Sequence, residues 1–218
     1  MAKTVVITGS SRGIGAQTAR EFAAAGYNVV INYLNSEEKA RVLAEEIGGI
    51  AVKADVSKEK EAKLLIDEAL RCFGTLDVLV NNAAIAQQKL FTDITGEEWD
   101  RMFEVNVKGA FNCTKAALKY MIKEHRGKII NISSMWGVTG GSCEVHYSAS
   151  KAALIGMTKA LAKEVGPSGI QVNCVAPGVI MTEMNSNLDE EAINEIKQET
   201  PLGVIGLPSD VAKTILFL

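Results

Sequence analysis

Three side chains suited to proton transfer lie between residues 134 and 151. Tyr147 and Lys151 are four residues apart, and Ser134 lies upstream of them across a glycine-containing loop. If the chain is helical from Ser148 to Val165, the phenol and the ammonium lie on one face, one turn apart. A nearby cation favours phenolate, so Lys151 is expected to lower the pKa of Tyr147 from about 10 towards neutrality. With the Ser134 hydroxyl as a second donor, both groups could stabilise an alkoxide as it forms.

The same spacing has an ordinary alternative. A tyrosine four residues before a lysine also arises by chance, as a partly exposed ring beside a solvated ammonium. The motif therefore gains functional weight only if the rest of the chain builds a site around it.

Composition restricts the class of protein. The 218 residues are enough for one substantial core, and we expect a single domain over residues 1–218. A net charge of -3 lacks the basic excess of a nucleic-acid-binding protein. The apolar run Val5–Ile7 is too short for a signal peptide, and no stretch has the length of a membrane span.

Four cysteines are widely separated: Cys72, Cys113, Cys143 and Cys174. Their spacing does not match that of a metal site, so no metal is expected. They are typical of reduced thiols, and the sequence predicts a cytoplasmic protein.

The N-terminal residues predict a strand, a glycine turn, a helix and a second strand. Val5–Ile7 is followed by Gly9, Gly13 and Gly15, then by helical apolar spacing, then by a strand at Val29–Ile31. Glycines in such a turn let backbone N–H groups and a helix N-terminus approach a pyrophosphate. The alternative, a turn that only separates two elements, is weakened by the strand and helix on either side.

The alternation continues to the end of the chain. Further strands are expected at Ile50–Val52, Val78–Val80, Ile129–Ile132 and Ile170–Val175. Helices are expected from Ser36, from a cap at Ser57, from a capping box at Thr95 to about Glu124, and from Ser148. Apolar strands that alternate with helices predict an α/β fold: a doubly wound parallel sheet of the Rossmann type, with helices on both faces.

Ligands of such sheets bind beyond the carboxyl ends of the strands. Five residues follow directly after expected strand ends: Gly9, Asp55, Asn82, Ser134 and Pro177. We therefore expect one rim of the sheet to carry the site.

With these elements placed, the chain resembles the short-chain dehydrogenase/reductase family. The matching motifs are Thr8-Gly9-x-x-x-Gly13-Ile14-Gly15, Asn81-Asn82-Ala83, Asn106, Ser134, Tyr147-x-x-x-Lys151, and Pro177-Gly178 followed by Thr182. Two departures are Ala84, in place of a usual glycine, and the end at Leu218, where relatives usually continue through one more strand. We therefore expect the C-terminal strand of the family to be missing.

The resemblance implies a role for each catalytic residue. Tyr147 would protonate a carbonyl oxygen while the nicotinamide delivers hydride to the carbon. Lys151 would lower the pKa of Tyr147 and bind the nicotinamide ribose, and Ser134 would hydrogen-bond the substrate oxygen. Asn106 would position a water in the proton relay. From the residues alone, Asn106 on an apolar stripe is equally well explained as a buried, hydrogen-bonded amide.

The resemblance also implies a nicotinamide cofactor. Its expected contacts are Gly9, Ser11, Arg12, Gly13, Ile14, Gly15, Asn32, Asp55, Val56, Asn82, Ala83, Tyr147, Lys151, Pro177, Gly178, Ile180 and Thr182. Relatives that use NAD place an acid at the end of the second strand. Here no carboxylate follows Ile31 before Glu37, and Arg12 could attract a 2′-phosphate. NADP(H) is therefore expected, with a solvated surface role for Arg12 as the alternative.

Three loops would select the substrate: Ile85–Ile94, Met135–His146 and Thr182–Thr200. The body of the chain resembles 3-oxoacyl-acyl-carrier-protein reductases of fatty acid biosynthesis, which implies an NADPH-dependent ketone reductase acting on acyl carrier protein. Within the first two loops, residues 86–94 and 142–146 are similar to those of elongation factor P 5-aminopentanone reductases, where Glu144 would suit a cationic amine. The alternative interpretation is that Glu144 and His146 are ordinary loop residues without a role in substrate binding.

A different class of function is a non-catalytic NADP-binding module. The joint presence of Asn106, Ser134, Tyr147 and Lys151 argues against it, because a binding module does not need all four.

Two helices also predict self-association. The helix from Thr95 and the helix after Tyr147 are apolar on more than one side, so each must bury more than one face. The resemblance implies that they pair with their symmetry mates, giving a dimer at least and a homo-tetramer when two dimers associate. Phe111 and Leu154 are the expected interface positions.

Overall fold

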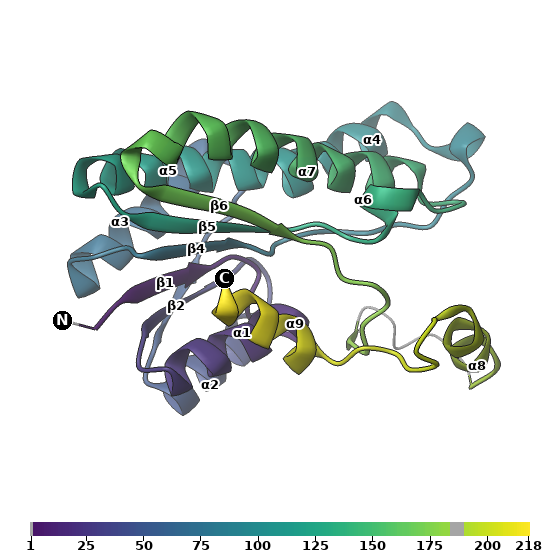
Figure 1. Cartoon of the computed structure of the whole chain (residues 1–218), viewed down its shortest axis with the longest axis horizontal. Helices are drawn as coiled ribbons and strands as arrows, with labels where there is room; N and C mark the ends of the chain where they lie inside the picture. Colours follow the sequence, from purple (N-terminus) through teal and green to yellow (C-terminus); the bar gives the residue numbers. More distant parts are fainter. Residues whose placement is uncertain (1, 184–189) are drawn as a thin grey trace.

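A six-stranded parallel sheet with the order β3-β2-β1-β4-β5-β6 forms the middle layer of the computed structural model, which describes residues 2–183 and 190–218 (Figure 1). The strands are β1 (Thr4–Ile7), β2 (Asn28–Tyr33), β3 (Ile50–Lys53), β4 (Val78–Asn81), β5 (Gly127–Ile132) and β6 (Ile170–Val175). The order reverses between β1 and β4, which is the switch point at which such sheets bind ligands. The predicted doubly wound α/β fold is confirmed.

Helices cover both faces of the sheet (Figure 1). One layer contains α1 (Gly13–Ala24), α2 (Glu37–Ile47) and α9 (Pro208–Phe217). The other contains α3 (Glu59–Phe73), α5 (Gly109–Glu124) and α7 (Val145–Val165), with α4 (Gly96–Phe103) at its end. The shorter elements are the 3-10 turns Phe91–Asp93 and Gly166–Ser168, the π turn Glu104–Lys108, α6 (Trp136–Thr139) and α8 (Glu190–Glu199).

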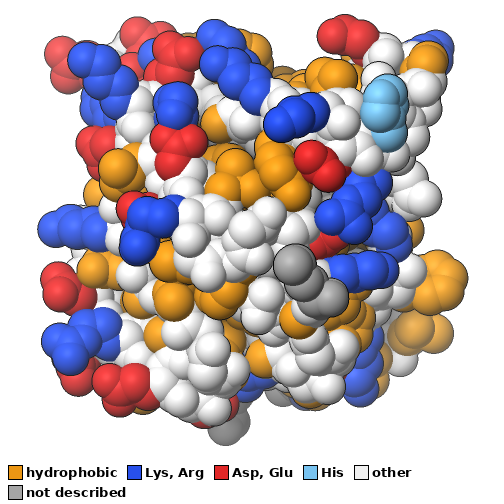
Figure 2. Space-filling model, turned by 90° about the vertical axis from the view of Figure 1, so that its left-hand side faces the viewer, with side chains coloured by type: hydrophobic (Ala, Val, Ile, Leu, Met, Phe, Trp, Pro, Cys, Tyr) orange, Lys and Arg blue, Asp and Glu red, His pale blue; other side chains and the backbone are white. Residues whose placement is uncertain are grey.

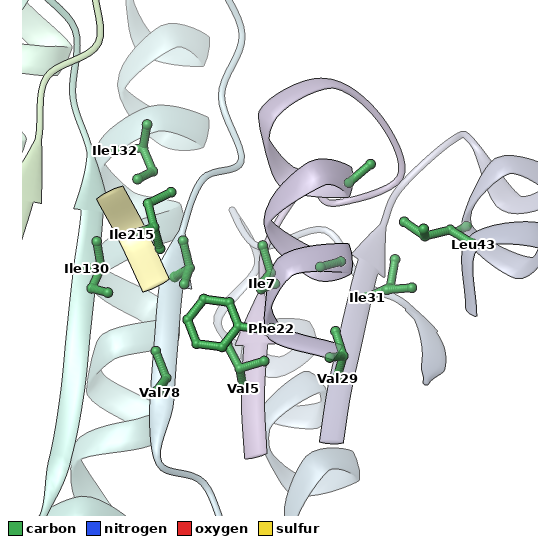
Figure 3. Close-up of a cluster of buried hydrophobic side chains, with 14 of the residues drawn as sticks. Val5, Ile7, Phe22, Val29, Ile31, Leu43, Val78, Ile130, Ile132 and Ile215 are labelled. Atoms are coloured by element: carbon green, nitrogen blue, oxygen red, sulfur yellow. The ribbon is translucent and has the colours of Figure 1, made fainter. Parts of the chain in front are cut away.

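Alternation along the strands supplies both halves of the core. In β1, Val5 and Ile7 belong to the cluster with Phe22 of α1 and Ile215 of α9, whereas Val6 belongs to the cluster on the other face. Figure 3 shows the first cluster, in which side chains from the central strands meet the helices that cover them. Successive side chains of a strand point to opposite faces, so strands that are apolar at every position require helices on both sides.

Three expected boundaries differ from the structure. Helix α7 begins at Val145 rather than Ser148, so Tyr147 lies inside it. The N-cap of α3 is Lys58, because the Ser57 hydroxyl donates instead to Asp55 Oδ1 at 2.6 Å. The single helix expected from Thr95 is divided by the π turn, although its capping box is confirmed.

Two further differences concern the outer layers. Helix α9 was not predicted, although Pro208 in its first turn and Asp210 at its third position are typical of a helix start. Leu154 is only 2% exposed in the chain, so it belongs to the core rather than to an interface surface. Phe111, in contrast, is 50% exposed.

The two ends of the sheet differ in what surrounds them. Figure 2 shows the amino-end side, where acidic and basic side chains alternate around scattered hydrophobic ones. The carboxyl ends of the strands open towards α6 and α8 (Figure 1). None of the helices in residues 2–183 and 190–218 combines the length and the apolar content needed to cross a membrane.

Candidate active site

The glycine turn after β1 fits tightly against the turn after β4. Gly9 has a φ of +61°, and a Cβ atom there would lie 2.8 Å from Ala83 Cα. A Cβ atom at Gly15 would lie 2.7 Å from the Asn82 side-chain nitrogen. Only glycine fits at these positions, because any side chain would separate the two turns.

The start of α1 has the properties of an anion site. Within the described chain, the N-cap residue Arg12 makes no side-chain cap, and the first turn carries no acid. The backbone N–H groups at such a helix end and the dipole behind them favour a phosphate. On the far side of the turn, Thr182 Cγ2 lies 3.7 Å from where a Gly13 Cβ would be. The residues present therefore fit the pyrophosphate of a dinucleotide.

Two asparagines predicted to contact the cofactor hold this turn in place. Asn32 is 2% exposed; its Oδ1 accepts from the Gly9 N–H at 3.0 Å, and its Nδ2 donates to the Ala54 carbonyl at 3.0 Å. The Asn82 amide donates to the Thr8 carbonyl at 2.9 Å and to the Gly9 carbonyl at 3.1 Å. The Asn32 side chain thus supports the loop, and its predicted contact with the cofactor stays a prediction.

The structure brings the three proton-transfer residues together. Ser134 follows the end of β5, whereas Tyr147 and Lys151 lie one turn apart in α7. Lys151 is 3% exposed, donates from Nζ to the Ile132 carbonyl at 2.8 Å, and has its Nζ 5.6 Å from the centre of the Tyr147 ring. The Ser133 hydroxyl donates to the Lys151 carbonyl at 2.8 Å, which ties α7 to the end of β5.

Burial controls the ionisation of this pair. It raises the pKa of Tyr147; a hydrogen bond with Ser134 acts in the lowering direction, and the charge of Glu144 acts in the raising direction. Burial lowers the pKa of Lys151 to about 8, with a small opposite effect from Cys174. The pKa of Tyr147 is therefore raised rather than lowered as predicted, because desolvation of the phenol outweighs the hydrogen bond from Ser134. Tyr147 is protonated at neutral pH, which is the form that a general acid requires.

Asn106 lies in the π turn and is 1% exposed. Its Nδ2 donates to the Ile85 carbonyl at 2.9 Å and to Ser150 Oγ at 3.0 Å, and its Oδ1 accepts from the Ile85 N–H at 2.8 Å. Single π turns inside helices are frequent at functional sites. Here the Asn106 amide joins the loop after β4 to α7, so its side chain is a buried, hydrogen-bonded amide. Its role in positioning a relay water stays a prediction.

The other expected cofactor residues lie along the same rim. Asp55 accepts from the Ser57 N–H at 3.0 Å; burial acts to raise the pKa of its carboxyl, but the Ser57 hydrogen bonds and nearby cations leave it lowered. Val56 and Ile180 are buried, and Ile14 packs against the core. The Pro177 carbonyl accepts from the Met135 N–H at 2.8 Å. Ser11 lies in the segment after β1, Ala83 in the segment after β4, and Gly178 and Thr182 in the segment after β6.

The substrate loops form a polar network that the sequence did not predict. Gln87 lies with its Oε1 3.1 Å from His146 Nε2 and donates to Glu98 Oε1 at 2.8 Å, while Lys89 donates to both Glu98 oxygens. These contacts link the loop after β4, helix α4 and the start of α7. Residues 184–189 of the third expected loop lie outside the described residues, and its second half is the helix α8.

Two buried polar atoms near Tyr147 have no hydrogen-bond partner in the described structure: Glu144 Oε2 and His146 Nδ1. Burial raises the pKa of Glu144 and lowers that of His146, so both are driven towards their neutral forms. A cavity of about 420 Å³ lies next to this region, lined by Ile85, Ala86, Gln87, Glu97, Glu98, Arg101 and Met102.

Comparisons with known proteins agree with this geometry. The family model described as short chain dehydrogenase matches residues 3–193. The chain is 45% identical over 222 residues to a 3-oxoacyl-[acyl-carrier-protein] reductase of Synechocystis sp., covering 100% of this chain and 89% of that protein. It is 41% identical over 223 residues to the 3-oxoacyl-[acyl-carrier-protein] reductase FabG of Staphylococcus aureus (strain Mu50), covering 100% and 91%.

A solved structure, ElxO with NADP bound, superimposes with a TM-score of 0.93 at 38% identity, covering 100% of this chain and 91% of that one. Fold, site geometry and sequence therefore agree, and the chain belongs to the short chain dehydrogenase family.

Proposed function

We propose that this protein is an NADPH-dependent carbonyl reductase that acts as a 3-oxoacyl-[acyl-carrier-protein] reductase, converting a 3-oxoacyl group to a 3-hydroxyacyl group. The observation that carries the proposal is the convergence of Ser134, Tyr147 and Lys151 at the carboxyl rim, beside a helix N-terminus suited to a pyrophosphate. The names of the 41% and 45% identical relatives support the choice of substrate.

Bound NADPH would supply the hydride that adds to the carbonyl carbon. Tyr147 donates its phenolic proton to the carbonyl oxygen, so that the two additions give a hydroxyl group and leave a phenolate. The Ser134 hydroxyl holds the same oxygen by a hydrogen bond. The Lys151 ammonium, charged at neutral pH, stabilises the phenolate until it is reprotonated.

The charges of the residues around the expected adenosine end support NADP(H) as the cofactor. The end of β2 carries no acid: Asn32 and Tyr33 close the strand, and the next carboxylates are Glu37 and Glu38 in α2. Arg12 lies in the glycine turn, where its side chain is 60% exposed. The NADP-bound solved relative supports the same choice.

Two rival functions can be separated by experiment. We expect NADPH to be oxidised in the presence of acetoacetyl-[acyl-carrier-protein], with Tyr147→Phe as the matched inactive variant. Turnover only with aminopentanone-modified elongation factor P would establish the alternative substrate. Absence of turnover with both ketones and with small ketones, while NADPH still binds, would identify a non-catalytic NADP-binding module.

The remaining features of the proposal concern organisation. Residues 1–218 form one catalytic domain, and the four free cysteines accord with a cytoplasmic protein. A homodimer through α5 and α7 is supported by the exposed ring of Phe111, and a tetramer would join two such dimers.

A further inference from the structure

One carboxylate joins two cations beside the glycine turn. The Lys39 ammonium donates to both carboxylate oxygens of Glu183 at 2.9 Å, and Arg12 Nη1 lies 3.9 Å from Glu183 Oε2. The hydrogen bond from Lys39, with the charges of Lys39 and Arg12, lowers the pKa of Glu183. Three segments far apart in the sequence therefore meet around a single negative charge.

The position of this cluster relates it to the adenosine end of a bound dinucleotide. Arg12 is the N-cap of α1, the helix that follows β1. Lys39 is the third residue of α2, the helix that follows β2. In this fold, the end of the second strand is where the ribose 2′ substituent is recognised. A 2′-phosphate would need a cation here, and Lys39 and Arg12, which lie near this place, both form ion pairs with Glu183.

We propose that Lys39 acts with Arg12 to bind the 2′-phosphate of NADP(H), and that Glu183 is a built-in competitor occupying both cations until the phosphate displaces it. This inference rests on the proposed use of NADP(H). It adds two specificity-determining residues: Lys39 raises the affinity for the phosphorylated cofactor, and Glu183 limits it.

Exposure makes the exchange feasible. The side chains of Arg12, Lys39 and Glu183 are 60%, 54% and 54% exposed, so the ion pairs are screened by water and open at small cost. A phosphate monoester carries a charge of roughly -1.5 to -2 near neutral pH, compared with -1 for the carboxylate, and has more acceptor oxygens. The phosphate is therefore the stronger partner for the two cations.

The consequence is a selective limit on cofactor affinity. NADPH must open the Glu183 bridge, so its measured affinity is lower than the two cations alone would allow. NADH has a hydroxyl at the same place and gains nothing from releasing the cations, so Glu183 does not affect its binding.

The test measures the dissociation constants of NADPH and NADH by fluorescence titration, without any carbonyl substrate. Glu183→Gln keeps the size of the side chain and removes its charge. We expect the substitution to tighten NADPH binding about fivefold, because NADPH then no longer has to break an exposed ion pair. The affinity for NADH should stay unchanged. Glu38→Gln is the control, since Glu38 is an exposed acid next to Lys39 in α2. An equal gain in Glu38→Gln would overturn the competitor role, because it would reflect net charge alone.

The role of Lys39 is tested in the Glu183→Gln background, where the bridge no longer masks it. Lys39→Gln should weaken NADPH binding about fivefold there, whereas Arg41→Gln, on the same helix, should not. If the unmutated protein binds NADPH no more tightly than NADH, the cofactor assignment itself fails. If it prefers NADPH but neither Glu183→Gln nor Lys39→Gln changes that preference, this inference fails and the assignment stands.

Discussion

The ammonium of Lys151 lies 5.6 Å from the centre of the Tyr147 ring and donates to the Ile132 carbonyl rather than to the phenol oxygen. The lysine is thus held by the end of β5, the strand that also leads to Ser134. This arrangement keeps a positive charge close to the phenol without a direct bond to it. Tyr147 retains its proton at rest, and the phenolate formed after transfer is stabilised.

Tyr147→Phe tests the proton donor. The substitution keeps the ring and removes the hydroxyl, so kcat should fall by on the order of a hundredfold or more, the range for loss of a general acid. The dissociation constant for NADPH should stay the same, since the ring still fills its place. Steady-state turnover measures the change in kcat, and a separate titration measures the dissociation constant for NADPH. Near-normal turnover would contradict the assigned role.

Lys151→Met tests the effect of the buried charge on stability. The folded-state pKa of about 8 lies below the ordinary lysine value of 10.5, so between these values the unfolded state binds more protons. The unmutated protein should therefore gain stability relative to Lys151→Met as the pH rises from about 8 towards 10. Urea unfolding of both proteins at pH 7 and at pH 9.5 measures the difference; parallel curves would refute it.

Arg12→Ala tests the cofactor preference. NADPH should bind the unmutated protein at least about tenfold tighter than NADH, a difference of about 1.4 kcal/mol, and the substitution should remove most of it. Arg20→Ala is the control, because Arg20 is in the same helix and pairs with Glu46 away from the turn. Fluorescence titrations with both nucleotides provide the comparison. Equal affinities in the unmutated protein would exclude the assignment.

The sequence predicted the elements whose signals are local. Apolar runs such as Val78–Val80 identify a buried strand, the Thr95 capping box identifies a helix start, and the spacing from Tyr147 to Lys151 places both on one helix face. The structure differs from the prediction where a side chain is oriented by residues distant in the sequence. Asn32 points inwards because the Gly9 N–H donates to its side-chain oxygen and the Ala54 carbonyl accepts from its side-chain nitrogen, both from other segments of the chain.

The same reason explains the features of the site that the sequence did not predict. The Lys39–Glu183 bridge joins residues 144 positions apart, and Asn106 reaches both Ile85 and Ser150 across the fold. No local pattern encodes such contacts. The pKa of Tyr147 was expected to fall because spacing reveals the neighbouring lysine, whereas the desolvation that raises it depends on how the surrounding loops pack.

Gly9→Ala tests the fit between the glycine turn and the turn after β4. The residue has a left-handed φ of +61°, and the new Cβ would lie 2.8 Å from Ala83 Cα. Backbone strain of about 1–2 kcal/mol and overpacking of about 1–3 kcal/mol should together lower the free energy of unfolding. Gly26→Ala is the matched control, because Gly26 has a φ of +83° but no atom within 4 Å of the added Cβ in the described structure. Denaturant midpoints of the two variants separate clash from strain, and an equal loss would argue against the close approach.

Phe111→Glu tests the proposed dimer. The Phe111 ring is 50% exposed on α5, with the Lys115 ammonium 5.7 Å from its centre, so a large apolar surface lies next to a solvated charge. If α5 and α7 meet their counterparts across a two-fold axis, a carboxylate at position 111 is buried twice in one interface, and each copy raises the free energy of association. Light scattering at micromolar concentration should then give a smaller particle for Phe111→Glu than for the unmutated protein. Val42→Glu, at an exposed position on α2, should leave the mass unchanged. A monomer for the unmutated protein would refute the proposed interface, and the exposed ring would then be an ordinary surface residue that Lys115 partly covers.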